Sequence, residues 1–117
     1  VDQSKILISK NELTTSHIGT CSVLLFSFNN LNFMAHIDAL QNTSIQIISK
    51  IKKNFDINKL KQTQVYIIPG AWCNTTCYTT QIIINALKKL QIEFIIYKKN
   101  IKWTNTIYID KNNITIT

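Results

Sequence analysis

Apolar residues along the chain gather in short runs separated by polar turns, which is typical of buried strands. The run 22–28 and the run 33–37 stand on either side of the asparagine-rich turn 29–32, so we predict a hairpin of two strands. Residues 14–17 are polar throughout and predict a loop. Similar apolar runs predict further strands at 5–8, 65–68, 93–97, 106–109 and 114–116, the last two joined as a hairpin by residues 111–113.

Two other segments repeat their apolar residues at helical spacing. Ile47, Ile48, Ile51 and Phe55 recur in this way with lysines between them, after the capping candidates Asn42, Thr43 and Ser44. This pattern predicts an amphipathic helix. A second helix is expected after the loop 71–77, because its apolar residues form one stripe, namely Ile82, Ile83, Ala86, Leu87 and Leu90.

The order of these elements predicts the fold class, which is α/β. We expect one layered domain, residues 1–117, with a mixed β-sheet and two helices packed on it. A chain of 117 residues with 45% hydrophobic residues is large enough for one core and too short for a second domain.

The charge of the chain restricts its partners. The net charge of +7 comes from 13 lysines and no arginine, and arginine is the usual reader of guanine edges, so we expect no specific nucleic-acid recognition. No apolar run is long enough for a membrane span, and the first residues lack the layout of a signal peptide. We therefore expect a cytoplasmic protein with no membrane contact. The sequence does not predict an oligomeric state.

One pair of residues suggests chemistry. Hydrolysis of a carboxamide needs a nucleophile, a base, a group that orients the base, and donors for the oxyanion. Cys21 stands directly before the first strand of the predicted hairpin, and His36 is near the end of the second. The hairpin brings these two positions side by side, and a neighbouring imidazole is expected to lower the pKa of the Cys21 thiol.

The motifs around this pair resemble those of the CheD-type glutamine deamidases. His17-Ile18-Gly19-Thr20-Cys21, followed by Phe33-Met34-Ala35-His36, is similar to the Leu-Gly-Ser/Thr-Cys turn and the Gly-Met-x-His strand of that family. The segment 65–71, VYIIPGA, resembles the strand of the family that ends in Gly-Gly-Ala. The resemblance covers about residues 5 to 117, and it extends to toxin deamidases of the cytotoxic-necrotizing-factor type.

The resemblance implies a role for particular residues. Cys21 is the nucleophile, His36 is its base, and Thr15, six positions before the cysteine, orients the imidazole. The oxyanion donors would be the backbone amides of Thr20 and Cys21. The implied activity is deamidation of a glutamine side chain in a protein substrate through a thioester, with no cofactor and no metal. Small stand-alone members of this fold are used as effectors, so a host protein is one candidate substrate.

Other residues have weaker assignments. Trp72, Gly70, Trp103 and Asp38 are candidates for the substrate cleft, and Asp38 is also a candidate second partner for His36 or for a loop N–H. Cys73 and Cys77 are four positions apart, which fits neither a Cys-x-x-Cys redox motif nor a complete zinc site. We therefore interpret them as free thiols.

Two alternative functions stay open at this point. Ala35-His36-Ile37-Asp38 is similar to a segment of the protein N-terminal asparagine amidohydrolases, which implies the same chemistry on asparagine. A non-catalytic basic interaction module with the same fold is the other alternative.

Overall fold

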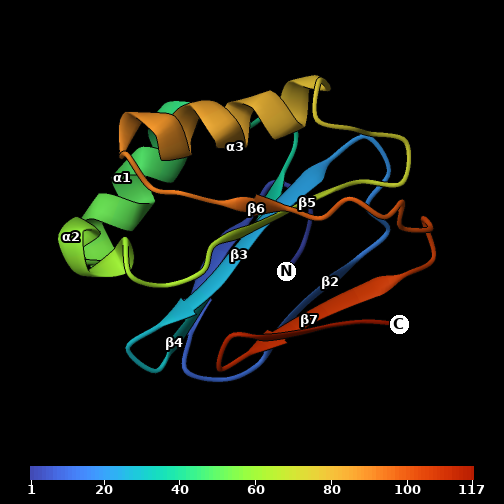
Figure 1. Cartoon of the computed structure of the whole chain (residues 1–117). Helices are drawn as coiled ribbons and strands as arrows, with labels where there is room; N and C mark the ends of the chain where they lie inside the picture. The colour runs from blue at the N-terminus through green and yellow to red at the C-terminus, as the bar shows by residue number, and fades with distance from the viewer.

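The computed structural model describes residues 1–117, which form three layers. A five-stranded mixed sheet in the middle has the strand order β1-β4-β3-β5-β6, and a three-stranded antiparallel sheet has the order β2-β7-β8. The helices cover one face of the five-stranded sheet and the smaller sheet lies on the side away from them (Figure 1). The strands are β1 Ile6–Ser9, β2 Leu13–Ser16, β3 Ser22–Phe28, β4 Leu31–Ile37, β5 Tyr66–Pro69, β6 Ile95–Ile96, β7 Thr106–Asp110 and β8 Asn113–Ile116, and the helices are α1 Ser44–Asn54, α2 Ile57–Leu60 and α3 Tyr78–Lys89.

The predicted α/β class is confirmed, with one correction to the sheet. The C-terminal hairpin does not join the main sheet but pairs with residues 13–16. This strand overlaps the segment 14–17, which we expected to be a loop. Residues 13–16 form the strand β2 because they alternate between the two sides, with Leu13 and Thr15 buried and Thr14 exposed. The predicted strand at 93–97 is also shorter than expected, since only Ile95 and Ile96 pair with β5.

Each hairpin has a two-residue turn that contains asparagine. Asn29 and Asn30 connect β3 to β4 with φ angles of 56° and 64°, and Lys111 and Asn112 connect β7 to β8 with φ angles of 50° and 63°. Positive φ at both central residues is the requirement of a two-residue hairpin turn, and asparagine tolerates it. The two predicted hairpins are therefore confirmed by the register of their strands.

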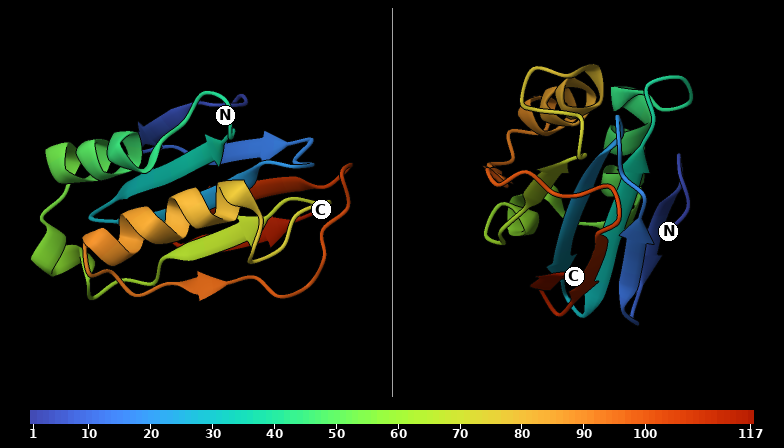
Figure 2. Two further views of the ribbon diagram at one scale, coloured as in Figure 1. Left: turned by 90° about the horizontal axis from the view of Figure 1, so that it is seen from above. Right: turned by 90° about the vertical axis from the view of Figure 1, so that its right-hand side faces the viewer.

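The two faces of the central sheet carry two separate cores. Side chains such as Leu24, Phe26 and Phe33 meet the helices, and the rings of Phe26 and Phe33 stack at 4.6 Å. Side chains on the other face, such as Val23 and Met34, meet the small sheet. Figure 2 shows the helices on one side of the strands and the C-terminal hairpin on the other.

The predicted helices are present with small changes in their bounds. Thr43, one of the three capping candidates, is the N-cap of α1 and forms a capping box with Gln46. The single-turn helix α2 was not expected. None of the helices has the length and apolar character that a membrane span requires.

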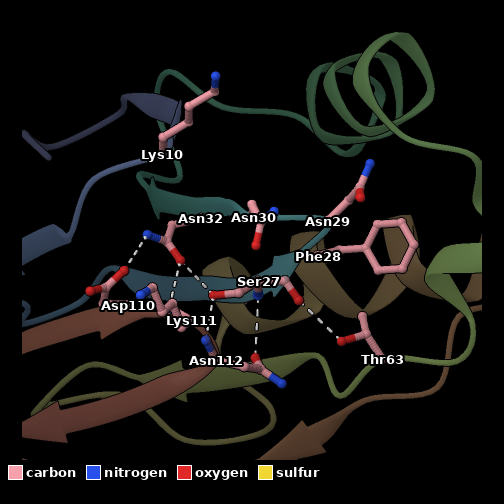
Figure 3. A pocket seen from close by; sticks show the side chains of 10 residues that line it. All are labelled: Lys10, Ser27, Phe28, Asn29, Asn30, Asn32, Thr63, Asp110, Lys111 and Asn112. Atoms are coloured by element: carbon pink, nitrogen blue, oxygen red, sulfur yellow. Dashed lines mark hydrogen bonds between the residues drawn. The ribbon is translucent and has the colours of Figure 1, made fainter.

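A polar network ties the two hairpins together at their turn ends. The amide of Asn32 is 2% exposed, and it donates to Asp110 at 3.1 Å and accepts from the Ser27 hydroxyl at 2.6 Å. The side chain of Asn112 accepts from the backbone N–H of Ser27 at 3.2 Å. These residues line a cavity of about 390 Å³ (Figure 3). Since the buried groups satisfy one another, we assign this cavity to the connection between the sheets.

Candidate functional site

Cys21 and His36 project from the same face of the central sheet. Val23 is the register partner of His36, and Cys21 precedes Val23 by two positions, so its side chain continues on the same face. Such diagonal neighbours on antiparallel strands lie about 7–8 Å apart, which is within reach of a long side chain. Both residues are buried, with 7% of Cys21 and 3% of His36 exposed. No hydrogen bond joins them: Nδ1 of His36 contacts Thr15, and Nε2 has no partner.

That partner is Thr15, which comes from the other sheet. The hydroxyl of Thr15 lies 2.8 Å from Nδ1 of His36, and both groups are buried. Strand β2 places it there because Thr15 pairs with Ile107 of β7 and faces the central sheet, as Leu13 does. The site is therefore built where the two sheets meet, and it exists only when both have formed.

A second contact of Thr15 fixes the tautomer of the imidazole. The Thr15 hydroxyl donates to the backbone carbonyl of Val1 at 2.7 Å. A hydroxyl has one proton, so towards His36 the same oxygen acts as the acceptor and Nδ1 of the ring carries the hydrogen. The lone pair of the imidazole is then on Nε2. This nitrogen is buried and has no hydrogen-bond partner.

The environment keeps both candidate residues neutral. Burial raises the pKa of the Cys21 thiol above its ordinary value, and the carboxylate of Asp38 raises it further. Burial lowers the pKa of His36, and Asp38 only partly opposes this effect. The expected lowering of the thiol pKa is therefore wrong for this structure. The reason is that both side chains are removed from water and are not hydrogen bonded to each other.

The loop that carries Cys21 is held by the backbone that follows β5. The N–H of Gly70 donates to the carbonyl of Cys21 at 2.9 Å, and the N–H of Trp72 donates to the carbonyl of Gly19 at 3.1 Å. A Cβ atom on Gly70 would lie 2.1 Å from the Gly19 oxygen. Gly70 thus lets two loop backbones approach closely, and this contact positions the loop 17–21, which carries Cys21.

Three hydroxyl groups form a hydrogen-bonded cluster next to the same loop. Thr79 donates to the carbonyl of Thr20 at 2.8 Å, and the hydroxyl of Ser22 lies 3.0 Å from Thr79 and 2.8 Å from Thr80. Ser22 and Thr80 are fully buried. Sequence reasoning missed these threonines, although two adjacent threonines at the start of an otherwise apolar helix were a usable signal.

Asp38 serves the turn after β4. Its carboxylate accepts from the Leu40 N–H at 3.2 Å and from the Gln3 side chain at 3.1 Å. It forms no hydrogen bond with His36, whose Nδ1 is bonded to Thr15 and whose Nε2 has no partner. Of the two hydrogen-bond partners considered for Asp38, His36 and a loop N–H, the structure shows the loop N–H.

A cavity of about 380 Å³ reaches the imidazole from outside. Thr15 and His36 line it together with Val1 and His17. Cys21 does not line it. The cavity is large enough for an amide side chain, and it approaches the pair from the side of the residues 1–3.

Trp72 and Trp103 lie beside Gly19, in the loop that carries Cys21. Their ring centroids are 6.4 Å apart and their planes differ by 7°. The ring of His17 lies 4.5 Å from that of Trp103. The two tryptophans come from loops after β5 and before β7, and both are exposed at the surface.

Cys73 and Cys77 are bonded as a disulfide, so their interpretation as free thiols is wrong. The turn between them brings their Cα atoms to 5.6 Å, which is within the range for a disulfide. Cys21 is the one free cysteine. No group of three or more histidine, cysteine or carboxylate side chains gathers as a possible metal site.

Comparison with known proteins gives no family assignment. No family model matches the sequence, and no curated protein matches it either. The resemblance to the CheD-type deamidases thus stays a prediction that depends on the motifs around Cys21 and His36.

Proposed function

We propose that the protein is a thiol amidohydrolase that deamidates glutamine side chains of a protein substrate. The observation that carries the proposal is the pair of contacts made by the Thr15 hydroxyl, with the Val1 carbonyl and with Nδ1 of His36, from which we infer the tautomer of the ring. Since Nδ1 donates to Thr15, Nε2 is left as a buried base on the sheet face that also carries Cys21. A base with a free lone pair beside a thiol is what activation of a neutral nucleophile requires.

The proposed reaction begins from the neutral pair. Nε2 of His36 takes the proton of the Cys21 thiol as the sulfur attacks the carbon of the substrate amide. The negative charge that develops on the amide oxygen is stabilised by the backbone N–H groups of Thr20 and Cys21. The protonated imidazole then gives its proton to the departing nitrogen, so that ammonia leaves and a thioester remains.

Water completes the reaction. Nε2 accepts a proton from a water molecule as that water attacks the thioester, and it returns the proton to the sulfur when the carbon–sulfur bond breaks. The products are a glutamate side chain and free Cys21. Because Cys21 is 7% exposed and does not line the cavity beside His36, the surrounding loops must open to admit the substrate amide.

The test is ammonia release from glutamine-containing peptides and proteins. We expect release with the native chain, a matching mass change of the substrate from amide to acid, and loss of both in Cys21→Ala. Thr115→Ala is a control for a threonine change elsewhere on the surface, because Thr115 is an exposed residue of β8. Release from an N-terminal asparagine peptide alone would assign the alternative substrate. The absence of release from any amide, with a well-folded protein, would favour the non-catalytic module.

The proposal includes a cytosolic location, where a free thiol such as Cys21 persists. The disulfide between Cys73 and Cys77 makes this part testable. If the protein works in a reducing compartment, rapid alkylation of thiols during cell lysis should recover these two cysteines alkylated, although the isolated chain bonds them.

A further inference from the structure

The two tryptophans of the chain both lie against the loop 17–21, which carries Cys21. Trp72 follows β5 and Trp103 precedes β7, and the two loops meet at one end of the sheets (Figure 1). A Cβ atom on Gly19 would lie 2.6 Å from the Trp72 ring and 3.4 Å from the Trp103 ring. Both indoles are therefore in contact with a residue two positions before Cys21.

Both rings are left open to solvent in this position. Trp72 is 71% exposed and Trp103 is 44% exposed, whereas tryptophan is a residue that folding usually buries to a large extent. Their planes differ by 7°, so the exposed parts of the two indoles form one apolar aromatic patch. An exposed aromatic pair of this kind is a surface for a partner.

The backbone that carries the two rings is held in place before any partner binds. The backbone N–H of Trp72 donates to the Gly19 carbonyl. Trp103 is in a turn closed by the bond from the Asn105 N–H to the Lys102 carbonyl at 2.9 Å, and the buried Ile101 anchors the chain just before it. A rigid aromatic surface loses little conformational entropy on binding.

The charge around the pair indicates what it binds. Lys98, Lys99 and Lys102 precede or flank Trp103 and are all exposed. The segment 97–105 contains no acidic residue. Cationic side chains of a partner, which could otherwise bind to the indole faces, are therefore disfavoured, and acidic segments are favoured.

We propose that Trp72 and Trp103 form a stacking subsite for an aromatic side chain next to the target glutamine, within an acidic segment of the substrate protein. This inference rests on the proposed deamidase function for the identity of the neighbouring amide. Stacking on the indoles would hold the aromatic residue, and the lysines of 98–102 would attract the acidic residues around it. The target glutamine would then stand beside the Gly19–Cys21 loop.

The test measures binding without turnover. The full chain carrying Cys21→Ala is titrated with three peptides that contain glutamine: one with a phenylalanine neighbour and acidic flanks, one with alanine in place of phenylalanine, and one with basic flanks. Trp72 and Trp103 are the only tryptophans, so their fluorescence reports the subsite directly. We expect the first peptide to bind roughly tenfold more tightly than the second, as aromatic stacking gives, and the third to bind most weakly.

Variants distinguish specific binding at the two tryptophans from nonspecific binding. Trp72→Ala should remove the preference for phenylalanine, Trp72→Phe should keep most of it, and Tyr78→Ala should leave it unchanged, since Tyr78 is an equally exposed aromatic residue outside the pair. Equal affinity for the phenylalanine and alanine peptides would overturn the inference. So would tight binding of a single-stranded oligonucleotide with no binding of the peptides, because bases also stack on exposed aromatic rings. Failure of catalysis alone would leave these affinities unchanged, so the two proposals fail separately.

Discussion

The substitution Thr15→Val tests the tautomer argument most directly. Valine has nearly the shape of threonine but lacks Oγ1, so Nδ1–H of His36 loses its acceptor inside a buried site. Leaving a buried donor without a partner costs about 1–3 kcal/mol. Without Oγ1 of Thr15, the acceptor that favours Nδ1–H over Nε2–H is gone, and the Nε2–H tautomer has no base on the side of Cys21.

The size of the effect follows from that cost. The productive tautomer must be restored in each turnover, and each 1.36 kcal/mol corresponds to about tenfold in rate. We therefore expect kcat/KM for ammonia release to fall by about tenfold to a hundredfold in Thr15→Val. Thr15→Ser keeps the oxygen that accepts from Nδ1 and the proton that goes to the Val1 carbonyl, so it should stay within a few-fold of the native rate.

Nitrogen NMR of the imidazole supplies a readout that does not depend on turnover. The native protein and Thr15→Ser should show His36 protonated on Nδ1, and Thr15→Val should shift the population towards Nε2–H. His17, the other histidine, is the internal reference because Thr15 does not contact it. A native His36 protonated on Nε2, or a Thr15→Val variant with unchanged tautomer and rate, would refute the reasoning.

Three further predictions concern the loops and the buried groups. Gly70→Ala places a Cβ 2.4 Å from the Cys21 carbonyl oxygen, so the loops must separate, and urea unfolding should show a loss of about 1–3 kcal/mol. Burial lowers the pKa of His36 in the folded state. The contribution of the neutral imidazole to stability is therefore present above pH ~6.5 and is lost as the pH falls through the lowered value. Calorimetry should show a drop in Tm on acidification that is smaller in His36→Gln. Iodoacetamide should label one cysteine of the denatured, unreduced chain, which is Cys21, and three after reduction opens the bond between Cys73 and Cys77.

The parts of the fold that the sequence predicts are those with strong local signals. The apolar runs at 22–28 and 33–37, with Asn29 and Asn30 at the turn between them, specify a hairpin by composition and turn chemistry together. The helix from Ser44 has its cap and its apolar stripe in the right order. In each of these cases local preference and tertiary packing agree.

The missed features depend on partners that are distant in the sequence. Strand β2 has only Leu13 as an apolar residue, and it becomes a strand because β7 provides its hydrogen bonds. The direction of the pKa shift of Cys21 comes from burial that the whole fold produces. The carbonyl of Val1, which completes the hydrogen bonds of Thr15, is a backbone group and therefore leaves no signature in residue type.

The imidazole of His36 differs from the other buried polar side chains in its hydrogen bonding. Nε2 of His36 is the one buried side-chain nitrogen or oxygen without a hydrogen-bond partner, and such a group costs about 1–3 kcal/mol. A leucine or a second methionine beside Met34, on the same face, would fill the space without that cost. The chain instead keeps the histidine and uses the one buried hydroxyl of β2 to hold its other nitrogen. A fold that satisfies its other buried side-chain polar groups and leaves this nitrogen free keeps a buried lone pair at a cost in stability, and such a lone pair is what the proposed role of His36 as a base requires.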